Sequence, residues 1–303
     1  MNLRPFLLVT LACIIWGLSP LFYRLLGDVD PKVIMSFRVI FSLFFLCFFL
    51  YFFNSGKKFI KIKKYLNSFG LILLASLMIG INQYGFIYSI SINEVLQASF
   101  AYYLFPLLAI FFGFVFFKES FTKIQFIAVF FAFFAIFLLS LGLNSIPLIS
   151  IIMGVTFAIY GMIKKKMDLN PLKTVFIEIA LLSPLALAFL LFIFKKNPEQ
   201  INSLNSYNYF LLLLSGLITA LPLWLFSVSS QQMRYSTLGM INYINPTLQF
   251  LVAVIIFFEP FNNLHLFSFI FIWSGLLFYS YDSIKPSFFK SKKISSTDSQ
   301  ILK

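Results

Sequence analysis

Charged side chains are scarce in this chain of 303 residues, at 11% of the composition, and only ten are acidic. Soluble globular domains carry about 25% charged residues. Hydrophobic residues, in contrast, make up 60% of the chain. A soluble domain of this length has no core large enough to bury so much apolar surface. The composition therefore excludes a soluble globular protein and predicts a polytopic membrane protein.

Cysteine and histidine are almost absent. Cys13 and Cys47 both fall in apolar segments, so we expect neither a disulfide framework nor a metal site. The single histidine, His265, is expected at the start of the last apolar segment as an interfacial residue. The chain also lacks HExxH, GxSxG and glycine-rich phosphate-binding motifs. These absences argue against an intramembrane enzyme and against ATP-driven transport, and no cofactor is expected.

The excess of positive charge, +13, is confined to short connections between apolar runs. This distribution is typical of membrane topology and not of nucleic-acid binding, so we expect no nucleic-acid partner. Of the 23 Lys and Arg residues, 18 fall on the side of the N-terminus, Lys164 among them, and three fall on the opposite side. The positive-inside rule therefore predicts that both termini are cytoplasmic.

Ten apolar segments are long enough to cross a bilayer as helices, which predicts an all-α fold. The predicted spans are 5–26, 32–53, 67–90, 95–117, 122–141, 146–163, 172–194, 208–230, 236–258 and 264–281. They divide into a first five-helix unit at 1–143, a second at 144–284, and a basic tail at 285–303 that we expect to be cytoplasmic and disordered.

One stretch of the sequence occurs twice, at 98–121 and 238–261, and its matching residues are 140 positions apart. The matched pairs include Tyr103/Tyr243, Pro106/Pro246 and Glu119/Glu259. Because each half has an odd number of spans, the two copies of the stretch cross the membrane in opposite directions, as in an inverted repeat. A proline frees a backbone carbonyl, so Pro106 and Pro246 predict matched helix breaks beside a binding site. The two glutamates are expected to cap helices or to pair at an interface.

Four runs carry a resemblance to a known family. They are IIWGLSPLFYRLL at 14–26, FRVIFS at 37–42, LQASFAYYLFPLLAIFFGFVFFKE at 96–119 and STLGMINYINPTLQFLVAVIIFFEPF at 236–261. The chain resembles the EamA-type drug/metabolite transporter superfamily, and within it the RarD branch of chloramphenicol-sensitive permeases. The resemblance implies two inverted five-helix repeats in the bacterial inner membrane. It also implies a central cavity lined by spans 1, 3, 4, 6, 8 and 9, through which members move small organic solutes.

Amides, hydroxyls and aromatic rings form stripes at helical spacing on the repeat helices, for example Asn242, Asn245 and Gln249. Contacts that join helices are one explanation for such groups, and the lining of a cavity is the explanation that we favour. The predicted substrate-binding residues are Trp16, Ser19, Tyr23, Asn82, Tyr84, Tyr102, Tyr103, Tyr160, Asn242, Tyr243, Asn245 and Gln249.

Three charged residues are candidates for coupling or for a charge pair: Arg24, Arg38 and Glu178. Arg38 and Glu178 occupy the same position in the two halves, 140 residues apart. In one hypothesis an arginine binds an anionic group and Glu178 binds a proton or cation. In the other, Glu178 forms a structural pair with an arginine across the repeat interface, and Arg24 extends to the membrane surface.

Together these features predict a secondary transporter that moves a small organic solute by alternating access. A passive channel and a membrane-embedded assembly subunit are the alternatives. The expected partners are the small-molecule substrate and the lipid bilayer, and a homodimer is left open.

The topology is directly testable. A reporter tag at the C-terminus should react with membrane-impermeant reagents in inverted vesicles and not in intact cells, because both termini are predicted to be cytoplasmic. Labelling of the tag in intact cells would contradict the predicted orientation.

Overall fold

The computed structural model describes residues 3–53, 62–141, 148–259, 263–264, 266–279 and 281–282, and in these ranges every regular element is a helix. Eight helices are long and apolar enough to cross a membrane. Two shorter apolar helices, Lys123–Leu138 and Leu266–Tyr279, lie where the fifth and tenth spans were predicted. The chain is therefore a polytopic α-helical membrane protein. His265 and the tail from 285 lie outside the described residues.

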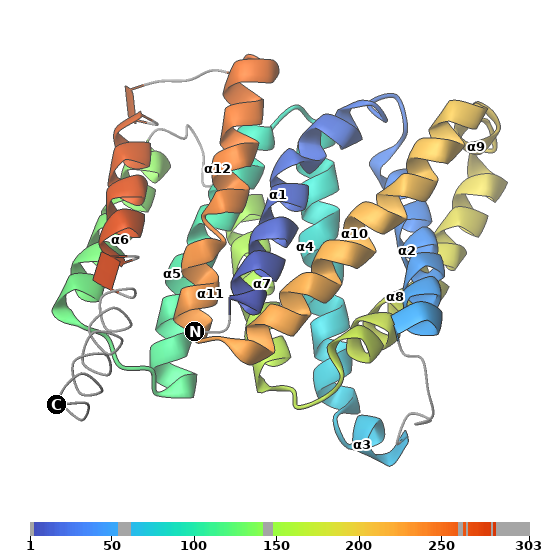
Figure 1. Ribbon diagram of the computed structural model, residues 1–303. Coiled ribbons are helices and arrows are strands. Elements are labelled where there is room, and N and C mark those ends of the chain that lie inside the picture. Colours follow the sequence, from blue (N-terminus) through green and yellow to red (C-terminus); the bar gives the residue numbers. More distant parts are fainter. Residues whose placement is uncertain are drawn as a thin grey trace, which may run out of the picture.

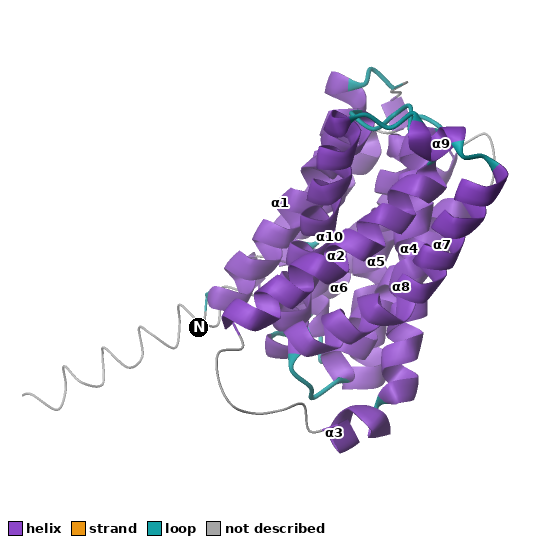
Figure 2. Ribbon diagram, turned by 90° about the vertical axis from the view of Figure 1, so that its right-hand side faces the viewer, coloured by secondary structure: helices purple, strands orange, loops and turns teal. Residues whose placement is uncertain are grey.

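The helices follow the predicted spans closely. In chain order they are α1 (Arg4–Arg24), α2 (Pro31–Phe53), α3 (Ile62–Asn67), α4 (Phe69–Ser91), α5 (Val95–Phe117), α6 (Lys123–Leu141), α7 (Leu148–Lys166), α8 (Pro171–Lys196), α9 (Glu199–Asn202), α10 (Ser206–Gln232), α11 (Tyr235–Ile241), α12 (Ile244–Leu251) and the π-helical turn η1 (Val252–Ile256). The long helices form one bundle, and the short helices α3 and α9 lie at its opposite ends (Figures 1 and 2).

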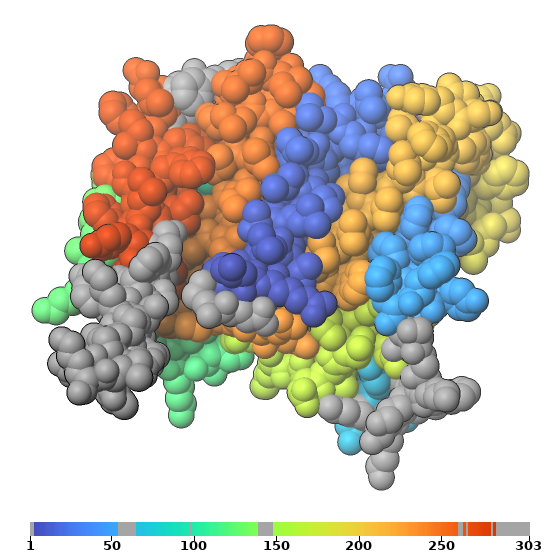
Figure 3. Space-filling model, in the orientation of Figure 1, coloured from blue at the N-terminus to red at the C-terminus, as the bar shows by residue number. Residues whose placement is uncertain are grey.

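Helices of the N-terminal half pack mainly against helices of the C-terminal half. The contacts join α2 to α8 and α10, α1 to α10 and α12, α4 to α7 and α8, and α5 to α7, α11 and α12. Figure 3 shows α12, α1, α10 and α2 side by side over one face of the molecule. The two halves are thus interleaved, and the interior is built from both of them.

The ninth predicted span is broken into α11, α12 and η1. Pro246 has no N–H to donate to the carbonyl of Asn242, one turn earlier. That carbonyl instead accepts a hydrogen bond from the N–H of Asn245 at 3.1 Å, which is the tighter turn found at helix ends. The break predicted at Pro246 therefore lies at Asn242 and Tyr243, between the two helices.

The matching break expected at Pro106 is absent, because α5 continues as a helix from Val95 to Phe117. This expectation was wrong for a physical reason: α5 packs along α7 and along α11 and α12, and these neighbours keep it helical past the missing hydrogen bond. At the crossing with α11, a Cβ added to Gly239 would lie 3.2 Å from the Cα of Pro106 and 2.6 Å from the Cβ of Ala109. Only glycine permits an approach this close.

The glutamate at the end of each repeat segment caps the helix of the other segment. The carboxylate of Glu119, just after α5, accepts hydrogen bonds from the N–H groups of Tyr235 at 2.6 Å and Ser236 at 3.1 Å, at the start of α11. The carboxylate of Glu259, just after η1, accepts from the N–H groups that begin α5, those of Val95 at 3.1 Å and Leu96 at 2.8 Å. The predicted capping role of both glutamates is confirmed. Burial raises the pKa of the Glu259 carboxyl, and these two N–H groups oppose the rise.

The backbone around the two glutamates also matches. Lys118 and Phe258 both adopt the left-handed conformation, with φ of 51° and 55°. The next N–H, of Glu119 or Glu259, then donates to a carbonyl six residues earlier at 3.0 Å in each case. This turn ends both helices and directs each carboxylate toward the start of the other helix.

Removal of either cap should destabilise the protein. Glu119→Ala leaves two N–H groups and the hydroxyl of Ser236 without their acceptor, which should cost about 1–3 kcal/mol. The readout is the melting temperature of the purified protein in detergent. The matched control is Glu199→Ala, at an exposed glutamate of α9, which should leave the melting temperature unchanged. Equal melting temperatures for the two variants would contradict the capping role.

Candidate functional site

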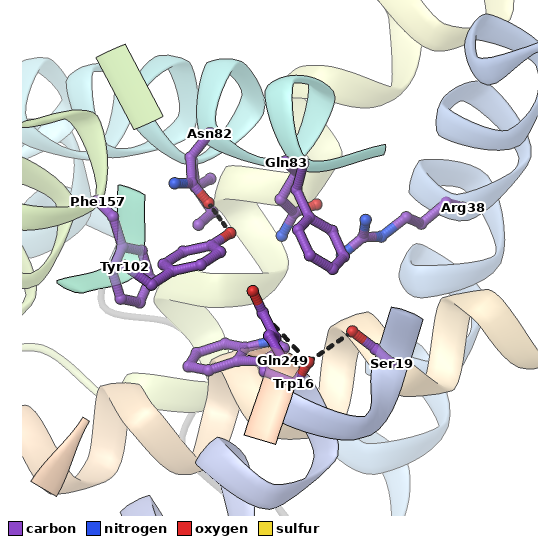
Figure 4. A pocket seen from close by; sticks show the side chains of 10 residues that line it. Trp16, Ser19, Arg38, Asn82, Gln83, Tyr102, Phe157 and Gln249 are labelled. Carbon is purple, nitrogen blue, oxygen red and sulfur yellow. Dashed lines mark hydrogen bonds between the residues drawn. The ribbon is translucent and has the colours of Figure 1, made fainter. Parts of the chain in front are cut away.

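A small cavity of about 20 Å³ lies inside the bundle, between helices of both halves. Figure 4 shows that the polar side chains around it point toward one another from different helices. Its lining residues are Trp16 and Ser19 of α1, Arg38 of α2, Ile79, Asn82, Gln83 and Phe86 of α4, Tyr102 of α5, Phe157 of α7 and Gln249 of α12.

The polar groups of this cavity are held by hydrogen bonds between helices. The hydroxyl of Tyr102 donates to Oδ1 of Asn82 at 3.1 Å, which joins α5 to α4 (Figure 4). Nε2 of Gln249 donates to Oδ1 of Asn245 at 2.9 Å and to the carbonyl of Trp16 at 3.4 Å. The other amide atom of Gln249, Oε1, is buried without a partner among the described residues. The wall therefore presents a free acceptor at this point.

Arg38 enters the cavity from α2 and is 3% exposed. Its Nε–H donates to the hydroxyl of Thr219 on α10, and its guanidinium lies 5.1 Å from the ring centre of Tyr23. Nη1 has no hydrogen-bond partner in the described part of the chain. Arg38 therefore brings an arginine cation with spare donors to the cavity.

The cavity is too small for an organic solute in this conformation. A volume of about 20 Å³ holds roughly one water molecule, whereas small-molecule sites measure roughly 300–1,000 Å³. In this conformation the cavity therefore has no room for a molecule of metabolite size.

The cavity contains five of the predicted substrate-binding residues: Trp16, Ser19, Asn82, Tyr102 and Gln249. The other uncharged members of the lining, Ile79, Gln83, Phe86 and Phe157, are not among the predicted substrate-binding residues. Three of these, with Asn82, are at positions i, i+3, i+4 and i+7 of α4. This helical spacing is a signal that would have identified the inward face of α4.

Two predicted tyrosines, Tyr103 and Tyr243, lie away from the cavity. Their rings are 6.0 Å apart, and Tyr103 also packs on Phe269 of the last apolar helix. Tyr103 follows Tyr102 directly, but successive residues of a helix differ in direction by about 100°. Tyr102 therefore lines the cavity, whereas Tyr103 joins the peripheral helices.

Other predicted binding residues form hydrogen bonds at helix ends or pack against neighbouring side chains. Asn242, just after α11, donates from Nδ2 to the carbonyl of Leu238 in that helix at 2.8 Å. Asn245 accepts from Gln249 as described above, and so supports a lining residue without lining the cavity. Tyr23 lies beside Arg38, and Tyr84 is 40% exposed in a separate groove of about 280 Å³ between α2, α4 and α8.

The set of helices around the cavity differs from that implied by the family resemblance. The second span, α2, contributes Arg38, whereas α10, the eighth, contributes no lining residue. It supports the site from outside the lining, through Thr219 beside Arg38 and through Phe226, which packs on Trp16 and Phe157. The reason is the close approach of α10 to α2. A Cβ added to Gly216 would lie 2.4 Å from the backbone of Phe41, so these two helices are in direct contact there.

Glu178 belongs to a second buried cluster, between α7 and α8. Its Oε1 lies 2.7 Å from Nζ of Lys164, and its Oε2 accepts a hydrogen bond from Tyr160 at 3.2 Å. The ammonium also donates to Thr174 at 2.6 Å. The predicted pairing of Glu178 with an arginine was wrong, because the last turn of α7 brings Lys164 to it within the same half.

Lys164 does not lie in a cytoplasmic connection, as the positive-inside count predicted, but in the last turn of α7. It is 0% exposed. Arg24, in contrast, is exposed at the end of α1, where its guanidinium donates to Asn93 and lies 4.9 Å from the ring centre of Phe257. That position agrees with the expected extension of Arg24 toward the membrane surface.

A bundle of apolar helices that encloses a polar cavity defines a multi-pass membrane protein. Its family is shown by comparison with known sequences. The chain belongs to the EamA-like transporter family, whose model matches residues 3–141 and again 144–281. It is 32% identical to an uncharacterized transporter of Vibrio cholerae over 93% of both chains. It is 31% identical to the protein RarD of Salmonella typhimurium, over 92% of this chain and 95% of that protein.

The fold is also found in solved structures. A crystal structure with 13% sequence identity superimposes with a TM-score of 0.65, over 92% of this chain and 97% of that chain. This similarity concerns the fold alone.

The buried pair of Lys164 and Glu178 predicts a double-mutant result. Lys164→Met leaves an unpaired buried carboxylate, and such a change costs about 3–5 kcal/mol. The double variant Lys164→Met/Glu178→Leu removes both charges and should recover most of the lost stability. The folded fraction after gel filtration and the melting temperature measure both effects.

The matched control is Lys166→Met, at an exposed lysine two residues further along α7, which should behave as the wild type. A double variant as unstable as the single variant would contradict a neutralising pair.

Proposed function

We propose that this protein is a secondary transporter that moves a small organic solute across the bacterial inner membrane by alternating access. The observation that carries the proposal is the closed polar cavity between the two halves of the bundle (Figure 4). Ionisable side chains inside a membrane, such as Arg38 in the wall of this cavity, mark substrate and ion pathways. The family membership supports the same class of function.

The proposal includes an inverted repeat of two five-helix units, at 1–143 and 144–284. Each helix of one half corresponds to the helix 140 residues away in the other half. The contact of α5 with α7 therefore corresponds to the contact of α11 and α12 with α1. In the same way, the contact of α4 with α7 corresponds to that of α10 with α1. The contact of α2 with α10 corresponds to that of α8 with α4. The reciprocal glutamate caps and the two separate matches to the family model support this symmetry.

Inverted symmetry supplies two equivalent states, one open to each side. Toward the end of the bundle that carries Arg24, the hydrogen bond from Arg24 to Asn93 joins α1 to the turn after α4. Toward the opposite end, Nζ of Lys165 donates to the carbonyl of Met233 at 2.6 Å and joins α7 to the turn after α10. We propose that these two contacts close the outer and the cytoplasmic ends of the cavity. In this arrangement both termini are cytoplasmic.

The closed cavity argues against the two alternatives. A passive channel needs a continuous path, and the cavity holds roughly one water molecule. An assembly subunit without transport activity needs no buried polar space at its centre.

The test is the accessibility of one cavity residue from both sides. In a background of Cys13→Ala and Cys47→Ser, the variant Gln83→Cys is labelled with an impermeant maleimide in intact cells and in inverted vesicles. Arg24→Ala should increase labelling from outside several-fold and decrease labelling from inside, because it releases the outer contact. Lys165→Ala should change both rates in the opposite direction.

The matched control is Lys166→Ala, an exposed lysine beside Lys165, which should alter neither rate. In a channel, Arg24→Ala would raise labelling from outside and leave labelling from inside unchanged. In an assembly subunit, Gln83→Cys would stay unlabelled from both sides in every variant. Either result would overturn the proposal.

A further inference from the structure

Arg38 is a buried cation without an anion. It is 3% exposed, and it forms no ion pair with any acidic residue in the part of the chain that the structure describes. Its contacts are the neutral hydroxyl of Thr219 and the face of the Tyr23 ring, and Nη1 has no partner. A charge inside a membrane-spanning helix is costly, so such a residue normally has a partner of opposite charge or faces a polar cavity.

The corresponding position of the second half shows how this chain neutralises a buried charge for structural purposes. Arg38 and Glu178 are each the eighth residue of a helix that begins with proline. Glu178 has the ammonium of Lys164 at 2.7 Å, whereas Arg38 has no equivalent carboxylate. The fold therefore neutralises one of the two positions with its own residues and leaves the other open toward the cavity.

The surroundings of Arg38 fit the rest of a small organic molecule. Gln83 is 5% exposed and forms no hydrogen bond with the described residues, so its amide is available to a ligand. The free Oε1 of Gln249 offers one acceptor. The rings of Trp16 and Phe157 lie 5.6 Å apart, edge to face, and give the cavity an apolar wall.

We propose that the transported solute is an organic monoanion whose carboxylate binds the guanidinium of Arg38 and whose apolar body packs on Trp16 and Phe157. The proposal rests on the transport function proposed above and names its substrate class. The planar guanidinium matches a carboxylate with parallel hydrogen bonds. One unpaired cation compensates one negative charge, so the cavity with a bound monoanion has no net charge. A cationic solute would be repelled by Arg38, and a dianion would keep one uncompensated negative charge.

The experiment compares acids with their uncharged amides. Purified protein is titrated with benzoate and benzamide, and with phenylacetate and phenylacetamide, while its melting temperature is recorded. The wild type should be stabilised by each acid, and the amide should bind roughly tenfold more weakly or worse, as expected for the loss of one charge-assisted hydrogen bond. Phenyl phosphate, a dianion at pH 8, should bind more weakly than the two carboxylates.

The variants assign the effect to Arg38. Arg38→Gln should reduce acid binding to the level of the amide, and Arg38→Lys should keep a preference for the acid. If Arg38→Gln does not fold, Thr219→Val provides a second measure. This variant keeps the charge of Arg38 but removes the hydroxyl that orients the guanidinium. The affinity for the acids should therefore fall, while the affinity for the amides stays unchanged. The matched control, Lys195→Gln, removes an exposed cation and should leave binding as in the wild type.

Equal binding of acid and amide, acid binding that persists in Arg38→Gln, or the absence of binding by any carboxylate would each overturn the proposal. None of these results bears on the accessibility test of transport, which uses no ligand. Binding of the amides alone would indicate a neutral solute at the same cavity.

Discussion

The carboxylates of Glu119 and Glu259 each accept hydrogen bonds from N–H groups that begin a helix in the other half of the chain. The first N–H groups of a helix have no partner within that helix, and a bilayer supplies no water to replace one. Each half therefore completes a helix of the other. Between the two caps, Gly239 lies against Pro106, so the backbones of α5 and α11 are in direct contact. The positions of the two halves relative to one another depend on this crossing.

The cavity depends on the crossing because its walls come from the same helices. Tyr102 projects from α5, and Gln249 projects from α12, beyond the break that Pro246 produces. The break supplies the change of direction, and the continuous α5 supplies a fixed neighbour. A hydrogen bond from Gln249 to the carbonyl of Trp16 then attaches α1 to this pair. Helices of both halves thus meet around one small polar space.

Buried charge is used sparingly in this structure. Among the described residues, the buried charged side chains are Arg38, Lys164 and Glu178. Two of them neutralise each other between α7 and α8, at a position that contributes nothing to the cavity lining. The third lies in the cavity wall and keeps an unpartnered nitrogen. The first two charges are thus paired within the fold, and the third is a positive charge without a carboxylate partner among the described residues.

Hydropathy alone determined the helical class and the span boundaries, because each membrane helix must satisfy its own backbone and does so within its own segment. The 140-residue spacing likewise predicted the capping glutamates, and the proline rule predicted the break near Pro246. Only the tertiary structure decided which way each helix faces. Tyr102 and Tyr103 are adjacent, yet one lines the cavity and the other packs outward. Lys164 continues a basic cluster, yet it is buried against Glu178. The direction of a side chain depends on the rotation of its helix, and contacts between distant segments set that rotation.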